Sequence, residues 1–140
     1  MTRRRRAGLL ALVIGLATVV VGTLAGCGDG DARACEEALT VAATSVDGVV
    51  EAEFTCERSF GNPSQEGSVT IAGATEAEVV AVMEDVLRAF AASAGLGDAS
   101  VVYTEFANED GTISVDPVQA GFNGTPSIRD LREHYGITPG

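Results

Sequence analysis

The chain has 140 residues, which leaves room for one domain and excludes a multidomain enzyme. Hydrophobic residues make up 46% of the chain but aromatic residues only 5%, with no Trp. We therefore expect a small core of Val, Ala and Leu around a few Phe. The 9 basic residues are all Arg and oppose 20 acidic residues, so the formal net charge is −11. We expect no nucleic-acid partner, because phosphate binding relies on a concentrated positive surface.

The first 26 residues have the three-part pattern of a signal peptide. Four Arg at positions 3–6 precede an uncharged apolar run over residues 7–24, and small residues follow. The run Leu24, Ala25, Gly26 and Cys27 resembles the lipobox of bacterial lipoproteins. The resemblance implies that residues 1–26 are removed and that Cys27 carries a diacylglyceryl thioether with fatty acyl chains such as palmitate. The membrane would then be a partner through this lipid, since two acyl chains suffice for stable anchoring.

Two alternatives remain open for this segment. Eighteen apolar residues lie at the short end of what spans a bilayer, so residues 7–24 could form an uncleaved anchor. The second alternative is ordinary secretion without a lipid anchor. We expect a lipid-anchored location on the extracytoplasmic face of the cell membrane. After Cys27 the chain has 5 Arg against 20 acidic residues, a formal charge of −15, which favours cationic partners or simply solubility.

Once Cys27 is assigned to lipid, Cys35 and Cys56 remain as a pair in an oxidising compartment and predict a disulfide. A helix over residues 35–46 rises about 16 Å, and a strand returning from residue 49 covers that distance in about five residues. The closed loop should stabilise the domain by about 3 kcal/mol. Neither cysteine lies in a C-x-x-C motif, and the lone His134 is distant in sequence, so we predict no metal site and no cofactor.

The first half of the chain after Cys27 predicts a tether, a helix and a hairpin. Residues 27–32 are small and acidic, which is typical of a tether. Apolar residues at helical spacing predict a helix over residues 33–46, with Asp31 as a possible N-cap and Gly48 at its end. Alternation then predicts a strand over residues 49–60, a turn over residues 61–67 and a returning strand over residues 69–71.

The second half predicts a long helix, another hairpin and a short helix. Thr75 and Glu78 have the spacing of a capping box before a helix that ends near Gly95 and Gly97. Strands over residues 100–107 and 113–115 flank a turn at residues 108–111. In the last segment, residues 117–140, Thr125 or Ser127 would cap a short helix that Gly136 closes.

This order of elements predicts an α+β domain over residues 33–116. We expect a small antiparallel sheet with helices on one face, and residues 117–140 packed on the same domain. Residues 34–106 look like the split-βαβ, ferredoxin-like modules of small exported bacterial domains, particularly uncharacterised lipoproteins of high-GC Gram-positive bacteria. That resemblance implies a fold and a location but no catalytic residue.

The predicted strand over residues 49–60 offers a candidate binding surface. Its outward side chains form an acidic stripe that continues toward a Gly-rich loop, and the residues concerned are Glu51, Glu53, Glu57, Arg58 and Phe60. Such a face could dock a cationic protein or peptide. The alternative is a solvated face whose charges discourage edge-to-edge pairing.

Catalytic signals are weak. His134 is the only imidazole, and no Ser lies in a G-x-S-x-G motif. Asn108, Glu109, Asp110 and Gly111 resemble a cation-binding turn but lack the full calcium-loop spacing. We therefore predict a non-catalytic binding or envelope-associated module, with a small extracytoplasmic hydrolase or other enzyme, or a structural spacer, as alternatives. An enzyme would set His134 in a concave site against a carboxylate or hydroxyl, whereas a binding module would leave it exposed.

Overall fold

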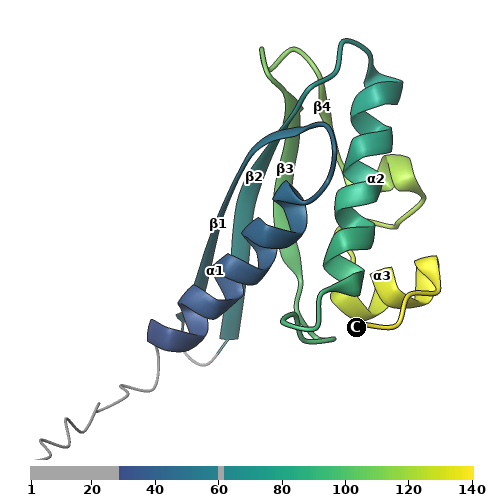
Figure 1. The fold of residues 1–140 in the computed structure, drawn as a ribbon. Coiled ribbons are helices and arrows are strands. Elements are labelled where there is room, and N and C mark those ends of the chain that lie inside the picture. The colour runs from purple at the N-terminus through teal and green to yellow at the C-terminus, as the bar shows by residue number, and fades with distance from the viewer. Residues whose placement is uncertain (1–28, 60–61) are drawn as a thin grey trace, which may run out of the picture.

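The computed structural model describes residues 29–59 and 62–140. The elements in chain order are α1 (Asp29–Thr44), β1 (Val49–Ser59), β2 (Asn62–Ile71), α2 (Glu76–Ala92), β3 (Val102–Asn108), β4 (Ser114–Val115), the 3-10 helix η1 (Pro117–Ala120) and α3 (Ile128–Tyr135). Figure 1 shows one sheet with α1 and α2 on the same face. The predicted α+β class is confirmed.

The sheet has the order β1-β2-β3-β4 and is mixed. β1 pairs antiparallel with β2, β2 pairs parallel with β3, and β3 pairs antiparallel with β4. The expectation of a fully antiparallel sheet is wrong at the central pair, because α2 crosses over between β2 and β3 and returns the chain in the same direction. β2 and β3 are direct neighbours, so the split arrangement, which places another strand between them, is also wrong.

The core lies between the sheet and the helices. Its largest fully buried side chains come from all three helices and from β2 and β3: Phe90, Phe106, Leu39, Ile71, Met83, Ile128, Leu131, Val69, Val79 and Val86. Phe54 of β1 meets Phe90 of α2 edge to face, with ring centroids 5.7 Å apart. Such aromatic pairs favour this geometry, because the positive ring edge faces the negative ring centre.

Helix α1 differs from its prediction at both ends. It begins at Asp29, so residues 29–32 of the predicted tether are helical and Asp31 lies inside the helix rather than at its N-cap. Acidic residues in a first turn are favourable because they face the positive end of the helix dipole. The helix ends at Thr44, and Gly48 follows at a φ of 95° in the turn that leads into β1. Glycine suits this left-handed position because it lacks a Cβ.

The predicted turn over residues 61–67 is wrong from Asn62 onward. Pairing of β1 with β2 begins at Ser59 and Asn62, and pairing of β2 with β3 begins at Gln65. Pro63 lies before the part of β2 that pairs with β3, so no residue of β3 needs an N–H donor from it. A strand tolerates proline at such a position. At Gly67 the ring of Phe54 lies where a Cβ would stand, so the glycine makes room for this aromatic side chain.

The capping box of α2 is confirmed. Thr75 Oγ1 accepts from the backbone N–H of Glu78, and Glu78 Oε2 accepts from the backbone N–H groups of Ala74 and Thr75. The Ala74 hydrogen bond is the largest of the effects that hold the pKa of the Glu78 carboxyl below its ordinary value of 4.5. The helix ends at Ala92, before the glycines that were expected to stop it.

The C-terminal segment joins the same core. Of the two predicted candidates, Ser127 and not Thr125 is the N-cap of α3, and Gly136 is its left-handed C-cap, as predicted. Ile128 and Leu131 are buried, and α3 lies against α2 (Figure 1). One side chain, that of Arg132, binds α3 to the end of α2 and to the loop that follows.

Arg132 is an almost buried cation with four partners. Its Nε donates to Ala91 O at 2.9 Å, and its Nη2 donates to Ser93 O at 2.8 Å and Leu96 O at 3.0 Å. Its Nη1 forms an ion pair with Asp98. The guanidinium thus satisfies carbonyls at the C-terminus of α2, where a helix lacks internal donors and where positive charge is favoured.

Candidate binding surface

The face of the sheet opposite α1 and α2 is polar, and its acidic part starts on β1. Glu51, Glu53, Thr55 and Glu57 are exposed, while Cys56 between them is buried against the helices. This alternation follows from the two-residue period of a strand. The predicted acidic stripe of Glu51, Glu53 and Glu57 is therefore exposed on one face.

The strand register extends this stripe across the sheet. Glu53 lies opposite Ser68, which in turn lies opposite Glu105 of β3. In the next row Thr55 lies opposite Glu66, and Glu66 opposite Tyr103. Since neighbouring strands are about 4.8 Å apart, the backbones that carry Glu53 and Glu105 are about 10 Å apart, with a serine between them.

We call the exposed carboxylates of these three strands the acidic face, and its members are Glu51, Glu53, Glu57, Glu66 and Glu105. Their cross-strand partners are Ser and Thr and, for Glu66, also Tyr103, so no two of them are direct cross-strand neighbours. This arrangement spreads negative charge evenly and limits the repulsion within the sheet, because directly opposed like charges destabilise strand pairs.

A hollow of about 640 Å³ occupies the centre of this face. Its lining includes four members of the acidic face, the exposed residue Tyr103, and Asp116 and Thr125 from the chain after β4, and none of its described lining residues is basic. Hydroxyl groups and carboxylates can together accept several N–H donors from a ligand. The surface therefore suits a positively charged ligand that is larger than a single ion.

Metal binding has no comparable support. Among residues 29–59 and 62–140, no three His, Cys, Asp or Glu side chains converge as metal ligands. In the turn at residues 108–111, Asp110 Oδ1 instead accepts from the hydroxyl and the N–H of Thr112. The Thr112 side-chain hydrogen bond is the main reason why the pKa of Asp110 is lowered. The carboxylate of Asp110 thus stabilises the turn itself.

Two residues grouped with the stripe do not lie on the described acidic face. Arg58 is exposed, but it follows Cys56 by two residues in the strand. It therefore lies on the same side of β1 as Cys56, which faces the helices. Phe60 lies outside the described residues, as do Cys27 and the signal segment 1–26. Conversely, the prediction missed Glu66 and Glu105 as members of the surface. The alternation of Ser64, Glu66 and Ser68 with buried Gln65 was the available signal, but it was hidden by the turn-forming residues around it.

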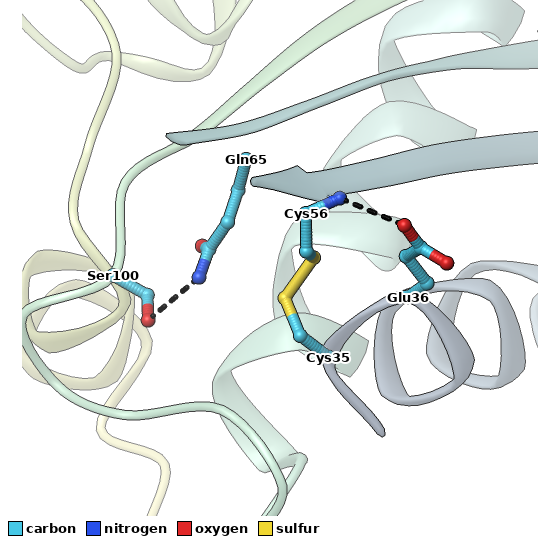
Figure 2. The surroundings of a disulfide bond; sticks show 5 residues. All are labelled: Cys35, Glu36, Cys56, Gln65 and Ser100. Carbon is cyan, nitrogen blue, oxygen red and sulfur yellow. Dashed lines mark hydrogen bonds between the residues drawn. A yellow bond between two sulfur atoms is a disulfide. The ribbon is translucent and has the colours of Figure 1, made fainter. Parts of the chain in front are cut away.

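The disulfide between Cys35 and Cys56 is confirmed, with their Cα atoms 6.2 Å apart (Figure 2). Beside it, the backbone N–H of Cys56 donates to Glu36 Oε1 at 3.1 Å, so α1 is bound to β1 twice. Gln65 extends toward the loop before β3, where its Nε2 donates to Ser100 Oγ at 3.2 Å. These contacts fix the end of the sheet whose opposite face carries the hollow.

His134 lies away from the acidic face, on α3. Its side chain is exposed. The centroid of its ring lies 4.4 Å from that of Phe122, with the rings tilted by 45°, and 4.7 Å from that of Tyr135, edge to face. It lines a shallow hollow with Asp130 and Glu133, but within the described part of the chain it makes no hydrogen bond or ion pair. Asp130 is held by Ser127 in the helix cap. Among the residues that the structure describes, the exposed imidazole thus has no acid–base partner.

Comparison of the chain with protein-family models, with curated proteins and with solved structures finds no match. Within residues 29–59 and 62–140, none of the helices combines the length and the apolarity that crossing a bilayer demands.

Proposed function

We propose that the protein is a lipoprotein, anchored through Cys27 on the extracytoplasmic face of the membrane, whose domain is a non-catalytic binding module for a cationic protein or peptide. The observation that carries the proposal is the acidic face. Five carboxylates from three strands lie on an uncovered surface, and none of the described residues that line its hollow is basic.

The location is supported from two sides. The run that ends at Cys27 has the lipobox pattern, and a disulfide such as that of Cys35 and Cys56 is typical of an oxidising compartment. Helix α1 begins at Asp29, only two residues after Cys27. A lipid on Cys27 would therefore hold the folded domain close to the bilayer, with little tether between them.

The charge of the face favours a cationic partner for a physical reason. After Cys27 the chain carries a formal charge of −15, so a cationic ligand relieves repulsion among the carboxylates. Each exposed ion pair contributes about 0.2–1 kcal/mol, and the five carboxylates together could contribute about 1–5 kcal/mol. Binding should therefore weaken steeply as the salt concentration rises, because these charges are exposed to solvent.

The proposal is tested by reversing charge on the face. The full-length chain, purified in detergent, is titrated into a labelled oligolysine peptide and binding is followed by fluorescence anisotropy. The double variant Glu51→Lys/Glu53→Lys removes two attractive pairs and adds two repulsive ones. At about 0.5 kcal/mol for each effect, this costs about 2 kcal/mol, or roughly a thirtyfold loss of affinity.

The matched control is Glu109→Lys/Glu133→Lys, which changes net charge equally at two exposed positions outside the acidic face. We expect its affinity to stay within about threefold of the parent, because only long-range attraction is lost. Equal losses in the two double variants would show that net charge alone attracts the peptide. Unchanged binding by the face variant would reject the proposed surface.

A further inference from the structure

The outer edge of β1 carries backbone groups that the sheet does not use. β1 has β2 as a partner on one side and ends the sheet on the other. The N–H of Cys56 donates to Glu36 Oε1 of α1, so the backbone groups of Cys56 point away from β2. In an antiparallel pair this direction repeats at every second residue. The N–H and C=O groups of Ala52 and Phe54 therefore point outward as well.

These outward groups are open to solvent. Within residues 29–59 and 62–140, no hydrogen bond satisfies the N–H of Ala52 or of Phe54. A shallow hollow of about 580 Å³ lies along this stretch, with residues 52–55 on one side and α1 on the other. Figure 1 shows α1 running along β1, and the Glu36 carboxylate of this helix reaches the outer edge of the strand at Cys56, beyond the stretch of Ala52 and Phe54. The edge can therefore accept another strand.

The two sides of this edge differ in chemistry. On the open side of the sheet, Glu51, Glu53 and Glu57 project at every second position. On the helix side, the hollow is lined by Thr40, by Val41, which is 61% exposed, and by the charged residues Arg33, Glu36 and Glu37. An added strand would thus meet a row of carboxylates on one face. On the other it would meet a mixed surface, apolar at Val41, that carries charges of both signs.

A second copy of the chain does not fit this edge. Antiparallel pairing of two β1 strands would bring glutamates from one copy against glutamates of the other, and like charges across a strand pair are destabilising. An extended segment with a basic residue at every second position has the complementary pattern. Its basic side chains would lie beside the acidic face, and its other side chains would lie toward Thr40 and Val41.

We infer that the cationic partner binds by strand addition, as an extended segment that hydrogen-bonds to Ala52 and Phe54 at the outer edge of β1. This inference rests on the proposed function and specifies the form in which the partner is recognised. Backbone hydrogen bonds fix the segment along the edge, and the alternation of basic with small or apolar side chains gives selectivity.

The test uses a labelled peptide of alternating lysine and threonine and two N-methylated forms of it. One form carries N-methyl groups on the lysines and the other on the threonines, so both have the same charge and the same number of blocked donors. In an added strand only one of these sets of N–H groups faces β1. We expect one form to lose at least roughly tenfold in affinity for the full-length chain and the other to bind within about threefold of the parent peptide.

A protein variant tests the same edge from the other side. Ala52→Pro removes an outward N–H and leaves the ladder with β2 in place, because an edge strand tolerates proline on its free side. We expect roughly tenfold weaker peptide binding with a melting temperature close to that of the parent. If this variant does not fold, the two methylated peptides still decide the question.

The outcomes separate the two proposals. If both methylated peptides bind as well as the parent peptide, or both lose binding equally, strand addition is overturned. The proposed function survives that result as long as Glu51→Lys/Glu53→Lys still weakens binding roughly thirtyfold. If the lysine–threonine peptide does not bind although oligolysine does, strand addition alone is overturned. If neither peptide binds, both the proposed function and strand addition are overturned.

Discussion

Replacing Arg132 with methionine should be the most damaging single change at the C-terminal end of the domain. The Arg132 side chain is only 13% exposed and donates to three backbone carbonyls besides its ion pair with Asp98. Hydrogen bonds to a charged group contribute about 1.5–3 kcal/mol each, but water can reach part of the freed carbonyls. We therefore expect the free energy of unfolding to fall by about 3 kcal/mol.

Thermal unfolding of the full-length chain, followed by circular dichroism, measures this loss. At roughly 4 °C per kcal/mol for a domain of this size, Tm should fall by roughly 12 °C. Arg88→Met is the matched control, because Arg88 also forms ion pairs, with Glu84 and Asp85, and lies over the Tyr135 ring, yet its side chain is 44% exposed. Exposed ion pairs contribute little, so this variant should lose less than about 1 kcal/mol. Equal Tm values for the two variants would refute the role given to Arg132.

Three further predictions concern the disulfide, a glycine and a helix cap. Cys56→Ser should lower the free energy of unfolding by about 3 kcal/mol, measured by urea denaturation, and a loss below about 1 kcal/mol would contradict it. Gly67→Ala should cost about 2 kcal/mol, since its Cβ would overlap the Phe54 ring, whereas Gly97→Ala should be nearly neutral, since its Cβ meets only Ser100 Oγ at 3.8 Å. The pKa of Glu78 is lowered in the folded chain, so its stabilising effect is complete above the unfolded value and is lost as pH falls through the folded value. The Tm difference between the parent and Glu78→Gln should therefore shrink as pH is lowered from 6 to 3, and a constant difference would refute this linkage.

Local signals in the sequence were sufficient for several elements. The Thr75 and Glu78 capping box, the Ser127 cap and the alternation of β1 each depend on residues a few positions apart, and the structure contains all three. The Cys35–Cys56 disulfide could be predicted because two adjacent elements, a helix and a returning strand, bring its ends together. In each case the physical cause is short-range in sequence.

Features that depend on strand pairing could not be predicted in the same way. Residues 62–67 carry the glycine, proline and asparagine typical of a turn, yet pairing with β1 makes them a strand. The parallel pairing of β2 with β3 depends on where α2 returns the chain. Glu66 and Glu105 join the acidic face only through that register, so the sequence predicted one strand of the surface and missed its other two.

Arg58 illustrates the opposite error. It follows Glu57 directly, and proximity in sequence suggested that the two would share a surface. The two-residue period of the strand instead places them on opposite faces, which leaves the acidic face without a cation from β1. Excluding Arg58 makes the face more uniformly negative than the sequence had suggested and strengthens the case for a cationic partner.

The central claim, that the domain is displayed at the membrane on a lipid, is tested most directly by the intact mass of protein extracted from membranes. A thiol-alkylating reagent is added before and after reduction. We predict a chain that begins at Cys27 and carries a diacylglyceryl group, with alkylation of two cysteines after reduction only. An unmodified polypeptide of all 140 residues whose three cysteines react without reduction would contradict the account.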